Sequence, residues 1–172
     1  MKEINIPSSI KELGCWHFGD CSNLTKINIP NSVTIIRNWC FMNCSNLAFI
    51  NIPSLVKEIG GCCFDDCKNL KEINIPNSVT LIGSCCFENC RSLTSIIISD
   101  LIMDDNSYRS EGLTKIGYKC FANCSNLKEI EIPNSVKEIN DKCFENCRSL
   151  TFIVIPNSVT KIGEDCFVGC PN

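Results

Sequence analysis

Apolar side chains recur along this chain in a fixed order that repeats about every 23 residues. The segments at 24–30 and 70–76 read LTKINIP and LKEINIP, in which apolar and polar residues alternate before the proline. This alternation predicts a short strand with one buried face. Pro30 and Pro76 end the strand because proline has no amide hydrogen to donate to a neighbouring strand.

The second half of each repeat predicts a turn, a second buried run and a bend. Asn-Ser-Val follows the proline and is typical of a turn. A glycine such as Gly60 or Gly83 then permits a sharp change of direction. The sequence CFENCRSLT occurs at 86–94 and again at 143–151. Its three- and four-residue spacings predict about one turn of helix with two cysteines and a phenylalanine on one side.

Aligned on this pattern, the chain divides into seven units without remainder. Six units have 23 residues and the fifth has 34, because it carries an 11-residue insertion. The units are 1–23, 24–46, 47–69, 70–92, 93–126, 127–149 and 150–172. Residues are numbered below by their position in the 23-residue unit, so Phe18 and Phe41 both hold position 18. Stacked units can bury apolar side chains that one unit cannot, so we expect a single solenoid domain over 1–172.

The unit L-x-x-I-x-I-P-N-S-V-x-x-I-G-x-x-C-F-x-N-C-x-N resembles the BspA-like leucine-rich repeat, a family of surface and adhesion-type proteins of bacteria and protists. The resemblance covers all seven units. It implies an α/β repeat solenoid: a curved, leucine-rich-repeat-like stack with a parallel concave sheet and short helical turns on the convex side. It also implies binding to host proteins or cells and no enzymatic activity. The chain departs from the family at position 17, where a small residue is replaced mostly by cysteine.

The chain has 16 cysteines, and most of them hold two unit positions. Position 21 is cysteine in every unit, and we expect a structural ladder of Cys21, Cys44, Cys67, Cys90, Cys124, Cys147 and Cys170. The favoured interpretation is that these thiols pack as small buried apolar groups. Disulfides, which need an oxidising compartment, catalytic redox use and metal binding remain as alternatives. The spacings C-C-x3-C at 62–67 and C-x-H-x3-C at 15–21 differ from the C-x2-C pairs of zinc modules.

Position 16 changes from apolar to charged along the chain, beginning with Trp16 and Trp39 and continuing with Cys62 and Cys85. We expect these side chains near the outer surface, either packed against each other or exposed as a strip for a partner. If exposed, the two cysteines would be prone to oxidation. His17 stands where most units have a position-17 cysteine, and we expect it to fill that slot in the core.

Composition excludes several classes of protein. A net charge of −3 provides no basic surface for nucleic acid, and no apolar stretch is long enough to span a membrane. No G-x-G-x-x-G, Walker, G-x-S-x-G or H-E-x-x-H motif occurs, so we expect no enzyme, no cofactor and no metal site. The amino end does not resemble a secretory signal, which with reduced cysteines favours the cytoplasm, whereas the family resemblance implies the cell surface.

A partner surface is expected where positions 3 and 5 of the strands face outward on the concave side. Position 5 is asparagine in the first four units, and we expect a solvated ladder of amides there, with ligand contact as the alternative. Apolar residues interrupt this polar face at Phe49, Ile97, Phe152 and Val154, which are the candidate contact residues. The alternative is that they are ordinary surface apolar side chains.

The insertion provides a second candidate contact. Its loop at 99–112 includes Asp104, Asp105 and Tyr108, which are further candidate contacts for the partner. The order of its acidic residues is not that of an EF-hand, so calcium binding is not expected.

Function is expected to follow from this repeat architecture. The favoured hypothesis is a non-catalytic scaffold for protein–protein interaction, in adhesion or recognition, that uses the concave sheet and the 99–112 loop. The alternatives are a thiol-rich metal-binding or redox-sensitive protein, and an architectural repeat protein that assembles with itself. Neither end carries a polar capping unit, so we expect either a longer array or self-association through uncapped ends.

Overall fold

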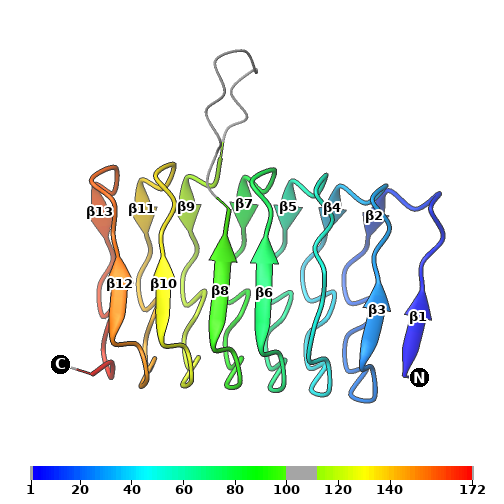
Figure 1. Cartoon of the computed structure of the whole chain (residues 1–172), viewed down its shortest axis with the longest axis horizontal. Helices are drawn as coiled ribbons and strands as arrows, with labels where there is room; N and C mark the ends of the chain where they lie inside the picture. The colour runs from blue at the N-terminus through cyan, green and yellow to red at the C-terminus, as the bar shows by residue number, and fades with distance from the viewer. Residues whose placement is uncertain (1, 100–111, 172) are drawn as a thin grey trace, which may run out of the picture.

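The computed structural model describes residues 2–99 and 112–171. Within those residues the chain forms thirteen short strands and no helix. Successive units stack as the coils of a parallel β-solenoid, and each coil contributes to two separate layers of strand (Figure 1).

The first layer contains the strands predicted from the apolar–polar alternation. They are β1 (Glu3–Asn5), β3 (Lys26–Asn28), β6 (Glu72–Ile75), β8 (Ser95–Ile98), β10 (Glu129–Glu131) and β12 (Phe152–Val154). They pair in parallel as β1–β3, β6–β8 and β10–β12, and the third coil adds a single bridge between Phe49 and Glu72. Ile73 and Ile75 are buried whereas Glu72 and Asn74 are exposed, which confirms the predicted alternation. We call the outward side of this layer, formed by positions 3 and 5, the long-strand face.

The second layer is one continuous parallel sheet of seven two-residue strands. They are β2 (Glu12–Leu13), β4 (Ile35–Ile36), β5 (Glu58–Ile59), β7 (Leu81–Ile82), β9 (Lys115–Ile116), β11 (Glu138–Ile139) and β13 (Lys161–Ile162). In Figure 1 these strands run opposite to the long strands. The second residue of the strand is buried in all but the last, as at Ile36 and Ile82.

The segment around the repeated Cys-Phe pair is not helical, so the prediction of short helical turns is wrong for the described residues. Cys85 and Asn89 have φ angles of 56° and 59°, and the equivalent positions are left-handed in the other coils. Two left-handed residues four positions apart, at positions 16 and 20 of the unit, prevent this segment from forming a right-handed helix. The amides pair with the next coil instead: the Phe87 nitrogen donates to the Cys120 carbonyl oxygen at 2.9 Å. This segment therefore joins neighbouring coils as a strand would.

Glycine at position 14 has a different role from the expected sharp bend. Gly83 does not have a positive φ, but a Cβ placed on it would lie 2.6 Å from the Cα of Gly61 and closer still to the nitrogen of that residue. The glycine therefore lets two coils approach closely. Arg37 and Asn140 hold this position in two other units, so the requirement is strict only in some coils.

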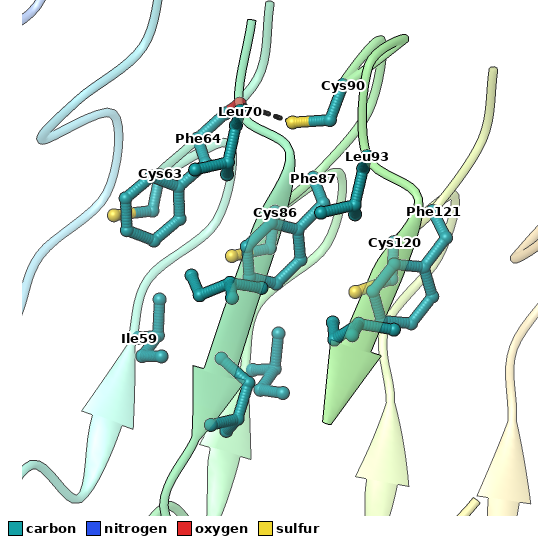
Figure 2. Close-up of a cluster of buried hydrophobic side chains, with 14 of the residues drawn as sticks. Ile59, Cys63, Phe64, Leu70, Cys86, Phe87, Cys90, Leu93, Cys120 and Phe121 are labelled. Atoms are coloured by element: carbon teal, nitrogen blue, oxygen red, sulfur yellow. Dashed lines mark hydrogen bonds between the residues drawn. The ribbon is translucent and has the colours of Figure 1, made fainter. Parts of the chain in front are cut away.

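A stack of phenylalanines runs through the centre of the solenoid. Neighbouring ring centroids lie between 5.3 and 5.6 Å apart, and adjacent ring planes are within 15° of parallel. Such rings form offset stacks, a favourable arrangement for aromatic pairs. Figure 2 shows Phe64, Phe87 and Phe121 in this stack, each beside a position-17 cysteine. The members are Phe18, Phe41, Phe64, Phe87, Phe121, Phe144 and Phe167. The stack and the surrounding aliphatic side chains form one continuous core.

Candidate functional site

The four apolar candidates for partner contact all lie on the long-strand face. Phe49, Ile97 and Phe152 are 54%, 60% and 57% exposed, and Val154 is 41% exposed. The strand register places each beside a polar side chain of a neighbouring coil, such as Glu129 beside Phe152. Large apolar groups therefore stand out of a face that is otherwise polar.

Two of these side chains line a shallow hollow of about 490 Å³ that extends over the second to fifth coils. Phe49 and Ile97 are apolar parts of its lining, and Asn51, Glu72 and Asn74 are polar parts. This combination of apolar surface with a few polar groups is typical of binding sites.

A second hollow, of about 310 Å³, lies where β8 and β10 are adjacent but not hydrogen-bonded as sheet neighbours. Ile97 and Phe152 line it together with Glu129 and Glu131. Neither carboxylate forms an ion pair with another residue in the described part of the chain. This acidic pair was not among the predicted contacts, although the sequence carries a signal for it, because positions 3 and 5 are both acidic in that unit alone.

The expected amide ladder on this face is present in part. The Asn28 side-chain nitrogen donates to the Asn5 side-chain oxygen at 3.2 Å, as predicted for stacked asparagines. Further along, the Asn74 side-chain oxygen accepts a hydrogen bond from the Ser99 hydroxyl at 3.3 Å. Some of the polar side chains on this face are thus already hydrogen-bonded to one another.

The candidate contacts in the insertion, Asp104, Asp105 and Tyr108, lie outside the described residues. Their role in binding a partner stays a prediction.

The position-21 thiols make a hydrogen bond that the sequence did not reveal. From the second coil onward each donates to the carbonyl oxygen of the phenylalanine in the preceding coil, at 3.1 to 3.2 Å. Figure 2 shows this contact from Cys90 to Phe64. The same oxygen already accepts the backbone N–H of Cys67 at 3.1 Å. A small side chain with a weak donor fits this place, which gives a physical reason for cysteine rather than alanine.

The thiols are unpaired and mostly shielded. All 16 cysteines are free in the structure. Burial raises the pKa of the Cys40 and Cys44 thiols to about 12 and that of Cys166 to about 11. Within residues 2–99 and 112–171, no three His, Cys, Asp or Glu side chains are grouped so that they could hold a metal ion. The metal alternative therefore receives no support from the described thiols. The half-buried Cys170 is an exception to this shielding, because a side-chain hydrogen bond with Cys147 lowers its pKa to about 7.

Position 16 and His17 lie further outward than the core. Trp16 and Trp39 are 46% and 42% exposed, and Cys62 and Cys85 are half-buried. The prediction that His17 fills a core slot is wrong, because its side chain is exposed. Its Nδ1 atom accepts the backbone N–H of Gly14 at 3.0 Å, and the residue belongs to the first coil, which no described coil covers on its outer side.

We expect these differences in burial to control thiol reactivity. At about pH 8 an alkylating reagent should modify the exposed Cys15 and the half-buried Cys62 well before the fully buried Cys63 and Cys86. Burial raises the pKa of both buried thiols, so the reactive thiolate is scarce at that pH as well as inaccessible. Mass spectrometry of alkylated peptides, with and without denaturant, measures the order. Rapid labelling of Cys86 in the folded protein would contradict this prediction.

Comparison with known proteins identifies the repeat. The family model described as the BspA type leucine rich repeat region (6 copies) matches over residues 1–113 and 105–172. No curated protein sequence gives a significant match. Among the described residues, none form a helix with the length and apolar character needed to cross a membrane.

Several solved structures share the fold. A leucine-rich repeat protein from Bacteroides ovatus is 34% identical with a TM-score of 0.87, over 98% of this chain and 41% of that protein. The T. pallidum leucine rich repeat protein is 30% identical with a TM-score of 0.84, over 97% of this chain and 75% of that one. A leucine rich cell surface protein from Faecalibacterium prausnitzii is 25% identical with a TM-score of 0.64, over 98% of this chain and 57% of that one.

This chain thus spans about two fifths of the length of the B. ovatus protein. The matches to the family model together cover residues 1–172, and the T. pallidum protein reaches 30% identity over 97% of the chain. The chain belongs to the BspA type leucine-rich repeat family.

Proposed function

We propose that this protein is a non-catalytic scaffold that binds another protein through its long-strand face. The observation that carries the proposal is the pair of adjoining hollows on that face, which share Ile97 and are bounded by Phe49 and Phe152. All three side chains are more than half exposed. When a partner covers exposed aromatic and aliphatic groups of this size, their burial contributes favourably to the free energy of binding. Such groups dominate interface energetics.

The charges beside these side chains indicate the partner's chemistry. Glu129 and Glu131 lie at the second hollow with no counter-ion from the described residues. A partner with an arginine or lysine next to an apolar side chain would neutralise these carboxylates and cover Phe152 in the same contact. The cation could also lie over the aromatic ring.

We include in this proposal that the protein is displayed on a cell surface. One similar structure carries the name of a leucine rich cell surface protein, and adhesion to a protein on another cell would use a face of this kind. The 99–112 segment follows β8 directly in the sequence, so we include it in the proposed contact.

We expect Phe49→Ala and Phe152→Ala to weaken binding of a selected protein ligand by about tenfold or more each, because each removes a large apolar contact. The ligand would be selected from a displayed polypeptide library against the intact chain, and its affinity measured by surface plasmon resonance. Selected sequences should contain a basic residue near an aromatic or aliphatic one. Deletion of the 99–112 loop is expected to weaken binding as well.

The matched control is Leu81→Ala, which removes a 48% exposed apolar side chain from the opposite layer. It should leave affinity unchanged. If Phe49→Ala, Phe152→Ala and the loop deletion all bind as the unaltered chain does, the proposed placement of the interface is refuted.

A further inference from the structure

A small polar hollow away from the long-strand face has the composition of an anion-binding site. It has a volume of about 210 Å³ and lies over the fourth to sixth coils. It is lined by Arg91, Asn123, Ser125, Asn146 and Arg148, all from positions 20 and 22 of the turn segment. No acidic side chain is part of this lining.

The side chains of the hollow have hydrogen-bond donors to spare. Asn146 uses its side-chain nitrogen to donate to the Asn123 side-chain oxygen at 3.1 Å. Within the described part of the chain, the Asn123 amide nitrogen and the Ser125 hydroxyl donate to no other group. The backbone N–H groups of Ser125 and Arg148 are already satisfied by carbonyl oxygens two residues earlier, at 2.9 Å each. A ligand would therefore be held by side chains.

The third coil provides an internal comparison for the two arginines. There Lys68 holds position 22 and pairs with Asp66 of the same coil at 3.4 Å. Beside Arg148 the residue equivalent to that aspartate is the neutral Asn146. Neither Arg91 nor Arg148 forms an ion pair with a described residue. The counter-charge present in the third coil is thus missing where the hollow lies.

The spacing of the arginines suits a small anion. Neighbouring parallel strands lie about 4.8 Å apart, so two coils separate the Arg91 and Arg148 backbones by about 10 Å. Two arginine side chains can converge over that distance, and the planar guanidinium group matches the oxygens of a tetrahedral anion. We propose that this hollow binds a phosphate or sulfate group between Arg91 and Arg148, with the Asn123 amide and the Ser125 hydroxyl as further donors.

The test is a titration of the whole chain with inorganic phosphate and, separately, inorganic sulfate at low chloride concentration, followed by ¹H–¹⁵N NMR of the arginine Nε and asparagine amide groups. We expect saturable shifts confined to the residues of the hollow. Arg91→Gln and Arg148→Gln should each weaken binding of the anion by about tenfold, because each removes one charged guanidinium group with its paired N–H donors. Lys161→Gln removes the same charge from the exposed strand β13 and should leave binding unchanged.

The decisive variant is Asn146→Asp, which restores at this coil the residue found in the third. The backbone should accept it, because Asp66 and Asn146 have nearly the same φ, 58° and 57°. Its carboxylate should pair with Arg148 and abolish anion binding. Because the substitution also removes the amide that donates to Asn123, thermal unfolding is measured alongside to show that the variant is folded. A response to only one of the two anions would identify which group the hollow prefers. Shifts that do not saturate, or that persist in Asn146→Asp, would overturn the proposal.

Discussion

Phe87→Ala is expected to lower the free energy of unfolding by about 3–5 kcal/mol. Phe87 is fully buried, and its ring is stacked between those of Phe64 and Phe121, with centroids 5.3 and 5.6 Å away. Alanine would leave a cavity in the middle of the core and remove both stacking contacts. Interiors are packed too tightly for the neighbouring coils to close such a gap completely. Urea-induced unfolding followed by circular dichroism measures the change.

The same substitution at the surface provides the control. Phe49 is 54% exposed and belongs to no stack, so Phe49→Ala should change unfolding by less than about 1 kcal/mol. Phe167 is partly buried at the last coil, and Phe167→Ala should cost an intermediate amount. Equal losses at all three positions would show that the aromatic stack does not determine stability.

Gly83→Ala is expected to destabilise the fold by about 1–3 kcal/mol, although it adds only a methyl group. The added Cβ would overlap the backbone of Gly61 in the preceding coil, where its Cα would be 2.6 Å away. Flexible side chains can move away from such a contact, but a hydrogen-bonded backbone cannot do so without disturbing its coil. Urea-induced unfolding again gives the size of the effect.

Gly61→Ala is the matched control for this change. A Cβ there would find one backbone oxygen at 3.2 Å and nothing else closer than 3.8 Å, so a small shift should relieve it. We therefore expect a loss well below that of Gly83→Ala. Equal stability of the Gly83→Ala protein and the unaltered chain would show that the coils can accommodate a Cβ here, as they accommodate Arg37 and Asn140 at the same position of other units.

These stability effects and the proposed binding effects are separable because they involve different sides of the strands. Ile27 and Ile73 point into the core from β3 and β6, whereas Phe49 and Ile97 stand on the outward face. Substitutions on that face should change recognition without unfolding the chain.

The repeat length and the alternation of its apolar residues determined most of the fold. Alternate side chains of a strand point to opposite faces, so the burial of Ile27 and Ile73 and the exposure of Phe49, Ile97, Phe152 and Val154 were predictable from the sequence. The stacking of Phe64 on Phe87 followed from the same repeat, because equivalent positions of stacked coils become neighbours.

Only the tertiary structure decided how the Cys-Phe segment folds. Its local spacing suits a helical turn, but the Phe87 amide donates to Cys120 in the next coil, and helices use bonds within the segment. Asn89 hinted at a left-handed residue, whereas Cys85 gave no such signal. The placement of Ile97 and Phe152 around one hollow, and of Arg91 and Arg148 around another, likewise depends on contacts between coils. Residues so distant in the chain come to line one hollow only after stacking, and stacking is a property of the whole chain.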